Sequence, residues 1–392
     1  MDEKPWKGWI PGVLCQGQMQ ELCSLGFITG TDDPPTLDPS SIDLHLADEG
    51  YCLPEGCTKP FGGKYLHVIQ REKLSGILDK EPDGGFTLKA RETYLFRVRE
   101  ELNLPEVNIH GQATAKSSVG RLDVLARLIV DGMDLYDCFN PEGLKVGKGK
   151  MYLEITPLTF PIRVKAGVSL SQLRLFYGAP DDSVMKGKEL YMALLQSGDD
   201  EREPDGSLSL DLSPTLIAGK EAVAYCALSE TQPGPISLWA EKYSIIRDEY
   251  FDIIAYKDCK RLVIKKSEFY ILRSKEKIAL PSDVAVYCRA TDENIGEMRI
   301  HYAGFVHPWF GFERADGQKG TPLIFEVRGH DLHVVLRDWE KMAKLIFYRM
   351  SRTADKPKDE DYNEQTLKLS KLFRERDERD ASPSSGLGRS EP

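Results

Sequence analysis

Short runs that alternate apolar and polar residues dominate the chain. Residues 40–46 read SSIDLHL, residues 206–212 read GSLSLDL, and residues 151–155 read MYLEI. A period of two predicts half-buried β-strands, and the Gly, Pro and Asp residues between the runs are typical of turns. The pattern therefore predicts a mainly β protein of short antiparallel strands, folded as jelly-roll or β-barrel domains with few short helices.

Helical patterns are scarce. Residues 13–26 place Leu14, Met19, Leu22 and Leu25 near one helical face, and Gly26 ends the segment. A polar stretch further on predicts a linker with one helical turn near 188–195. The expected organisation is an N-terminal helical segment (1–35), a first β domain (36–180), a linker (181–204), a second β domain with a C-terminal segment (205–373), and a disordered tail (374–392).

The two β domains are repeats of each other. YLFRVREELNLP at 94–105 and YILRSKEKIALP at 270–281 share Tyr94/Tyr270, Arg97/Arg273, Glu100/Glu276, Leu104/Leu280 and Pro105/Pro281. The strands at 40–46 and 206–212, the loops at 116–122 and 292–298, and the segments 151–164 and 323–336 correspond in the same order. Four matched segments in one order indicate a tandem duplication.

Charge narrows the range of partners. The 392 residues include 52 Lys and Arg against 62 Asp and Glu, a formal net charge of −10. This balance argues against coating nucleic acid or an anionic membrane, but it leaves room for a small polyanion held by local cations. The chain contains no apolar run of about 18 residues and no secretion signal at its start, so we expect a cytoplasmic protein without a membrane segment.

The sequence contains no recognisable metal-binding motif. The eight cysteines form no CxxC pair, and HExxH and the HxE with PCxxC of zinc deaminases are absent from the sequence. We expect reduced thiols and no metal site.

One loop suits a phosphate ligand. Lys116-Ser117-Ser118-Val119-Gly120-Arg121 combines two hydroxyls, a glycine and two cations. An ordinary solvated turn would look similar.

A strand glutamate occurs in both repeats. Glu154 lies in MYLEI, and Glu326 holds the equivalent place in IFEV. Each could simply face solvent, but in a closed pocket desolvation would raise its pKa and suit it to proton transfer near neutral pH.

A third segment is a hairpin at 302–311, YAGFVHPWFG, whose backbone around Gly304 could bind a base edge. His307 is as well explained by a structural role as by ligand binding. The counterpart in the first repeat runs from Ile129 to Asp134.

Taken in order, SSIDLHL, the ELNLP turn, KSSVGRL, the hairpin, YLEI and LSQLRLF resemble the dCTP deaminase and dUTPase superfamily. From about residue 10 to 373, the chain is similar to the bacterial double-domain dCTP deaminases. HYAGFVHPWFG, FEVR and the late segment YNEQ with LKLSK also match that family.

The resemblance implies metal-independent hydrolytic deamination of dCTP to dUTP and ammonia, which makes the protein a hydrolase of a cyclic amidine C–N bond in pyrimidine deoxynucleotide biosynthesis. Glu154, or Glu326 by the duplication, would activate the water that attacks cytosine C4, and Ser117 belongs to the catalytic set. The resemblance assigns the remaining contacts as follows: triphosphate to Lys116, Ser117, Ser118 and Arg121; base and sugar to Val130, Asp131, Asp134, Gly304 and His307; closure over the nucleotide to Tyr362 and Gln365.

This sequence departs from the family pattern in both repeats. Lys116 stands where Arg is usual, and His307 replaces the usual Asp. The second repeat's loop reads DENIGE at 292–297, whose carboxylates would repel a triphosphate. Two hypotheses follow: a composite site that uses the first repeat's loop, or a complete site within the first repeat with the second as scaffold.

Two other functions stay open. A dUTPase-type pyrophosphatase could use Asp134 as the base, and a non-catalytic deoxynucleotide-binding scaffold would bind without turnover. The resemblance also implies a homo-oligomer, with a trimer favoured, no resident cofactor, and Mg²⁺ only as the counterion of the triphosphate.

Overall fold

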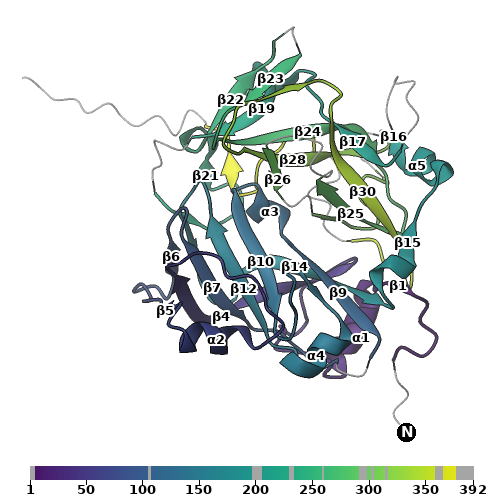
Figure 1. Ribbon diagram of the computed structural model, residues 1–392. Helices are drawn as coiled ribbons and strands as arrows, with labels where there is room; N and C mark the ends of the chain where they lie inside the picture. Colours follow the sequence, from purple (N-terminus) through teal and green to yellow (C-terminus); the bar gives the residue numbers. More distant parts are fainter. Residues whose placement is uncertain are drawn as a thin grey trace, which may run out of the picture.

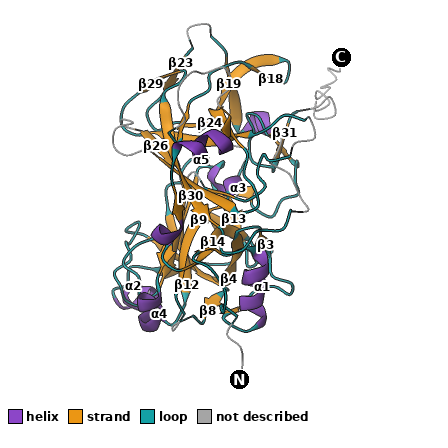
Figure 2. Ribbon diagram, turned by 90° about the vertical axis from the view of Figure 1, so that its right-hand side faces the viewer, coloured by secondary structure: helices purple, strands orange, loops and turns teal. Residues whose placement is uncertain are grey.

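The computed structural model describes residues 5–104, 107–196, 205–228, 234–257, 260–290, 298–301, 304–313, 317–357 and 365–376. The predicted fold class is confirmed: strands dominate, and the described helices are short. Figure 1 shows the first repeat in the lower half and the second repeat in the upper half, each folded around its own sheets. Figure 2 shows the same two β domains from the side.

The first half of the chain contributes these elements: β1 (Gly12–Val13), α1 (Gln16–Ser24), β2 (Ile28–Thr29), β3 (Leu37–Asp38), β4 (Ser41–Leu53), α2 (Tyr65–Arg71), β5 (Gly76–Ile77), β6 (Phe86–Leu88), β7 (Thr93–Val98), β8 (Glu101–Leu102), β9 (Ile109–Ala115), α3 (Ser117–Gly120), β10 (Val124–Val130), β11 (Cys138–Phe139), α4 (Pro141–Gly147), β12 (Met151–Pro157), β13 (Ile162–Val164) and β14 (Ser169–Tyr177).

The remaining elements are η1 (Pro180–Ser183), β15 (Val184–Met185), α5 (Lys188–Leu194), β16 (Leu195–Gln196), β17 (Ser207–Ser209), β18 (Thr215–Ile217), β19 (Lys220–Ala227), β20 (Ile236–Ser237), β21 (Ile245–Ile246), η2 (Arg247–Glu249), β22 (Phe251–Ala255), β23 (Arg261–Ile264), β24 (Phe269–Ile278), β25 (Val284–Ala290), β26 (Met298–His301), β27 (Phe305–Val306), β28 (Thr321–Gly329), β29 (Val334–Arg337), β30 (Lys341–Arg349) and β31 (Phe373–Arg374).

The main sheet of the first domain runs in the order β10-β12-β7-β4-β14-β9-β11. Adjacent strands of this sheet pair antiparallel. The alternating pattern predicted half-buried strands, but β12 is buried along its whole length and β4 along its first six residues, so both faces of these strands are covered. The helix predicted in 13–26 is present as α1, and its Met19 and Leu22 are buried in the same core as Ile42 and Leu44 of β4. The N-terminal segment thus packs as part of the first domain.

The two larger sheets of the second domain run in the orders β18-β19-β24-β28-β26 and β15-β30-β25-β27. Its central pair β24 and β28 corresponds to β7 and β12 of the first domain, as the repeat predicts. Glu100 and Glu276, identical between the repeats, are both buried and both accept a backbone N–H bond, from His45 at 2.8 Å and from Ser209 at 2.6 Å. The duplicated sequence therefore forms the same kind of buried hydrogen bond, from a backbone N–H to a glutamate side chain, in both domains.

The two domains are joined by more than the covalent linker. β13 of the first domain pairs in parallel with β20 of the second. Arg328 of β28 forms an ion pair with Asp123 of the first domain and donates to Thr159 Oγ1 at 2.9 Å. In the expected linker, α5 confirms the helical turn, and β15 and β16 pair with β30 and β24 of the second domain.

Three expectations from the sequence concern residues that the structure describes. The seven cysteines among them are free thiols. The described helices include none that is long and apolar enough to cross a membrane. The expected disordered tail begins at a residue that is part of β31, and 377–392 lie outside the described residues.

Candidate active site between the two domains

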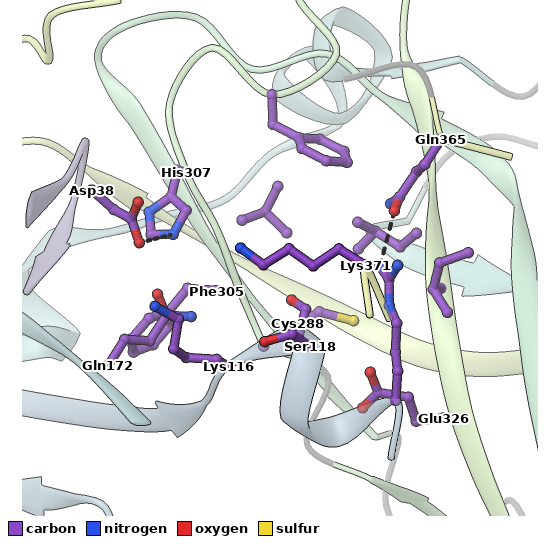
Figure 3. Close-up of a pocket in the computed structure, with 17 residues that line it drawn as sticks. Asp38, Lys116, Ser118, Gln172, Cys288, Phe305, His307, Glu326, Gln365 and Lys371 are labelled. Atoms are coloured by element: carbon purple, nitrogen blue, oxygen red, sulfur yellow. Dashed lines mark hydrogen bonds and ion pairs between the residues drawn. The ribbon is translucent and has the colours of Figure 1, made fainter. Parts of the chain in front are cut away.

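A pocket of about 240 Å³ lies between the domains. Its walls are shared by the two repeats (Figure 3). The first repeat contributes Asp38, Lys116, Ser117, Ser118, Arg121 and Gln172; the second contributes Cys288, Gly304, Phe305, Val306, His307, Phe310, Leu323, Ile324, Glu326, Gln365 and Lys371.

The loop with the two serines forms one wall of the pocket. Ser117 and Ser118 begin the single turn α3, which follows β9 directly. Ser117 is exposed and Ser118 is half-buried, so both hydroxyls are accessible from the pocket. Lys116 forms an ion pair with the buried carboxylate of Asp43 on β4. The pairing holds this ammonium at the pocket wall beside the serines.

Arg121 follows the same loop and is almost fully buried, 3 % exposed. Its guanidinium donates to Gln365 Oε1 at 2.9 Å and to the backbone carbonyls of Lys368 and Leu369, each at 3.2 Å. Gln365 in turn donates to the carbonyl of Pro322 at 3.1 Å. The loop of the first domain is therefore tied to the C-terminal segment and, through it, to the start of β28.

Glu326 lies on β28 of the second domain and packs against the Ser–Ser loop of the first domain. Burial raises the pKa of its carboxyl to about 8, with Asp123 acting in the same direction and Arg121 against it. The carboxylate lies directly over Gly120, where an added Cβ would be 2.3 Å from Glu326 Oε2. Glycine at this position lets a titratable carboxyl reach the Ser–Ser loop.

The hairpin forms the opposite wall. Gly304, the strand β27 and His307 line the pocket, and His307 Nδ1 is 2.8 Å from Ser40 Oγ of the first domain. In Figure 3, Asp38 and His307 lie at one end of the pocket, and Glu326 and Gln365 lie at the other. The side chain of Lys371 extends between these two ends.

The structure brings together most of the residues expected to form a site. Lys116, Ser117, Ser118, Arg121, Gly304, His307, Glu326 and Gln365 all line this one pocket. Tyr362 and the second repeat's loop at 292–297 lie outside the described residues.

Glu154 does not line this pocket. It is buried within the first domain and accepts hydrogen bonds from Tyr136 OH at 3.0 Å, Tyr65 OH at 3.2 Å and the Thr58 backbone N–H at 3.1 Å. Three donors thus occupy its carboxylate, and two of them belong to α2 and the segment before it. The corresponding glutamates of the two repeats therefore have different surroundings.

The three expected base and sugar contacts of the first repeat are also elsewhere. Val130 is buried at the end of β10, and Asp134 is exposed in the following turn. Asp131 is buried and accepts the Tyr65 backbone N–H at 2.9 Å. None of the three lines the pocket between the domains, whose wall at this place comes from the second repeat's hairpin.

Four polar pocket residues were not singled out from the sequence: Asp38, Gln172, Cys288 and Lys371. Gln172 and Lys371 lie within LSQLRLF and LKLSK, segments that carry the family resemblance, so their position in those motifs was an available signal. Asp38 and Cys288 lie outside the matched motifs, and the sequence offers no signal for them.

The fold and the pocket define a tandem dUTPase-like β protein with one described site built across its two repeats. Residues 10–179 match the family described as "2'-deoxycytidine 5'-triphosphate deaminase (DCD) N-terminal domain", and residues 181–373 match its C-terminal domain. The chain belongs to the dCTP deaminase family.

A solved structure agrees with this assignment. The crystal structure of 2'-deoxycytidine 5'-triphosphate deaminase from Agrobacterium tumefaciens is 26 % identical and superposes with a TM-score of 0.75, covering 88 % of this chain and 97 % of that one. A comparison with curated proteins gave no significant match.

Proposed function

We propose that this chain converts dCTP and water to dUTP and ammonia in the pocket between its domains. The observation that carries the proposal is Glu326, a buried carboxyl whose pKa is raised to about 8 and which packs against the Ser–Ser loop of the other domain. A carboxyl that titrates near neutral pH can accept a proton and return it within one reaction cycle.

In this mechanism the ionised Glu326 takes a proton from a water molecule as the water oxygen bonds to C4 of cytosine. The carboxylic acid gives this proton to ring nitrogen N3, and Glu326 then moves the proton of the new C4 hydroxyl to the exocyclic amine. The C4–N bond breaks, ammonia leaves, and the carbonyl of uracil forms at C4. The glutamate ends the cycle ionised, because each proton that it accepts is passed on.

The triphosphate would bind at the cationic part of the pocket. Ser117 and Ser118 offer hydroxyl donors, and Lys116 and Lys371 offer positive charge. Arg121 adds charge and orders the C-terminal segment through Gln365. Mg²⁺ would accompany the nucleotide as the counterion of its phosphates, bound to the ligand and not to a site of the protein.

The proposal favours the composite site over a complete site within the first repeat. Glu154 has its oxygens engaged by Thr58, Tyr65 and Tyr136, whereas Glu326 packs against Gly120 of the loop and lines the same pocket as the two serines. Each repeat therefore supplies a different part of the machinery: the first supplies the phosphate loop, and the second supplies the carboxylate and the hairpin.

The test is to measure ammonia and pyrophosphate release from dCTP and from dUTP for the wild type, Glu326→Gln and Glu154→Gln. We expect ammonia from dCTP, a loss of at least about 100-fold in Glu326→Gln, and retained turnover in Glu154→Gln. Full activity of Glu326→Gln would contradict the assignment. Pyrophosphate release from dUTP without ammonia release from dCTP would show a dUTPase-type enzyme instead.

A further inference from the structure

Arg174 is a buried cation behind the pocket wall. It lies on β14 of the first domain and is fully buried. Its guanidinium donates to the carbonyl of Val286 at 2.9 Å, to Ser40 Oγ at 3.1 Å and to the carbonyl of Val306 at 3.4 Å. It also lies 4.0 Å from the centre of the Phe305 ring. Arg174 thus contacts the hairpin through Phe305 and Val306 without lining the pocket itself.

The buried position of this arginine is energetically demanding. Burial lowers its pKa to about 9, so the group is still a cation at neutral pH. Within the described part of the chain, no carboxylate lies within ion-pair distance of the guanidinium. An unpaired buried charge destabilises a fold unless its hydrogen bonds compensate, which suggests that the hydrogen bonds of Arg174 serve the site.

The hydrogen bond from Arg174 orients the hydroxyl of Ser40. A guanidinium only donates, so Ser40 Oγ is the acceptor in this contact. Ser40 is fully buried, and its second described hydrogen-bond partner is His307 Nδ1 at 2.8 Å. The serine hydrogen is satisfied when it points at this nitrogen. His307 Nδ1 is then an acceptor, and the ring proton lies on Nε2.

The imidazole is neutral as well as fixed in tautomer. Burial lowers the pKa of His307 to about 3, and the cations Arg174 and Lys116 act in the same direction against Asp43. The ring therefore presents one N–H donor, at Nε2, throughout the physiological pH range.

That donor faces a carboxylate in the pocket. His307 Nε2 is 3.8 Å from Asp38 Oδ2, too far for a direct hydrogen bond but close enough for one hydroxyl oxygen to reach both atoms. A hydroxyl accepts one hydrogen bond and donates another, so it complements an N–H next to a carboxylate. A 2′-deoxynucleoside 5′-triphosphate has one free hydroxyl, on C3′ of its sugar.

We propose that Arg174 and Ser40 are positioning residues that lock His307 as an Nε2–H donor, and that this donor and Asp38 together bind the 3′-hydroxyl of the nucleotide. The inference rests on the proposed function for the identity of the ligand. It assigns a role in nucleotide recognition to an arginine that does not touch the nucleotide.

The first test reads the tautomer directly and needs no substrate. Two-dimensional ¹H–¹⁵N spectra of protein labelled in its histidine rings distinguish Nδ1–H from Nε2–H, and the signal that His307→Asn removes identifies this residue. We expect the neutral Nε2–H form in the wild type and a mixture of tautomers in Ser40→Ala. The Nδ1–H form in the wild type, or an unchanged spectrum in Ser40→Ala, would overturn the relay.

The second test measures the response to the hydroxyl. Ammonia release from dCTP is compared with release from 2′,3′-dideoxycytidine triphosphate. We expect the wild type to prefer dCTP in kcat/KM by about tenfold or more, and Ser40→Ala to lose most of that preference through a higher KM for dCTP. The matched control is Ser183→Ala, another buried serine, whose hydroxyl donates to the Pro180 carbonyl at 2.7 Å outside the pocket. Equal use of both nucleotides by the wild type would overturn the hydroxyl site.

Failure of this inference and failure of the proposed function give different results. If the wild type releases no ammonia from dCTP, the deaminase proposal fails. Calorimetric binding of the two nucleotides then still decides the hydroxyl site, and the tautomer spectrum still decides the relay. A wild type that deaminates dCTP and dideoxy-CTP equally well supports the deaminase and rejects the hydroxyl site.

Discussion

The glutamates that correspond in the two repeats should respond in opposite ways to the same substitution. In Glu326→Gln a buried carboxyl is replaced by a neutral group of similar size. Burial raises the pKa of this carboxyl to about 8 in the folded protein, from an ordinary value of 4.5. The folded state therefore holds a proton that the unfolded state has lost between these pH values, and the contribution of Glu326 to stability falls as pH rises through that window.

The size of the effect follows from the two pKa values. Linkage gives a penalty for the wild-type carboxyl that grows by about 2 kcal/mol between pH 6 and pH 8, because only the unfolded state is ionised over most of that range. Glutamine carries no such penalty. The stability of Glu326→Gln relative to the wild type should therefore rise by this amount across the interval.

Glu154→Gln provides the contrast. The carboxylate of Glu154 accepts bonds from Thr58, Tyr65 and Tyr136, all of which donate. A glutamine amide has one acceptor oxygen, and its NH₂ group would face a donor. Loss of a hydrogen bond to a charged acceptor costs roughly 2 kcal/mol, so this variant should be less stable than the wild type.

Urea unfolding followed by tryptophan fluorescence at pH 6, 7 and 8 measures both effects. The predicted result is a Glu326→Gln advantage that increases with pH and a Glu154→Gln deficit. A constant difference between Glu326→Gln and the wild type at all three pH values would refute the reasoning about the buried carboxyl. Equal stability of Glu154→Gln and the wild type would refute the reasoning about its three donors.

Three further predictions concern the same junction. Gly120→Ala should lower ammonia release from dCTP at least roughly tenfold, because the added Cβ would displace the Glu326 carboxylate. The control Gly76→Ala has open space around the added Cβ and should keep the wild-type rate. Equal rates of ammonia release for the two variants would argue against the contact between Gly120 and Glu326. The kcat/KM for dCTP should rise with pH up to about 8, since the base must be ionised, and a flat profile between pH 6 and 8 would contradict this role for Glu326. Arg328→Gln removes the ion pair between Arg328 and the buried Asp123 and should cost about 3 kcal/mol in urea unfolding, so an unchanged midpoint would show that this pair contributes little.

The sequence carried much of the fold because strand patterns are local. Alternation in SSIDLHL and MYLEI predicted β4 and β12, and the shared ELNLP and KIALP turns predicted the repeat. The helix α1 followed from the spacing of Met19 and Leu22, although Leu14 and Leu25 of the predicted helical face lie outside it. These features depend on residues close together in the chain, where hydrophobic periodicity is informative.

Local sequence patterns could not show which of the two glutamates, Glu154 or Glu326, lies in the pocket between the domains. Both occupy the same place in the same pattern, and what distinguishes them is tertiary: Tyr65 and Tyr136 reach one, and the loop of the other domain reaches the other. Asp38 presents the same difficulty, because its partner His307 lies in the opposite repeat. Contacts across a domain boundary are not encoded in local periodicity.

The sharing of one pocket between the repeats also makes the duplication difficult to reverse. A gene that lost its second half would keep the Ser–Ser loop but not Glu326, and its remaining glutamate would still be held by Tyr65 and Tyr136. A gene that lost its first half would keep Glu326 without that loop. Recombination could exchange one half with a relative only if the partner also matched the surface around Gly120 and Asp123. Because both repeats contribute to one pocket, we expect them to be inherited as a unit and to change in a coordinated way.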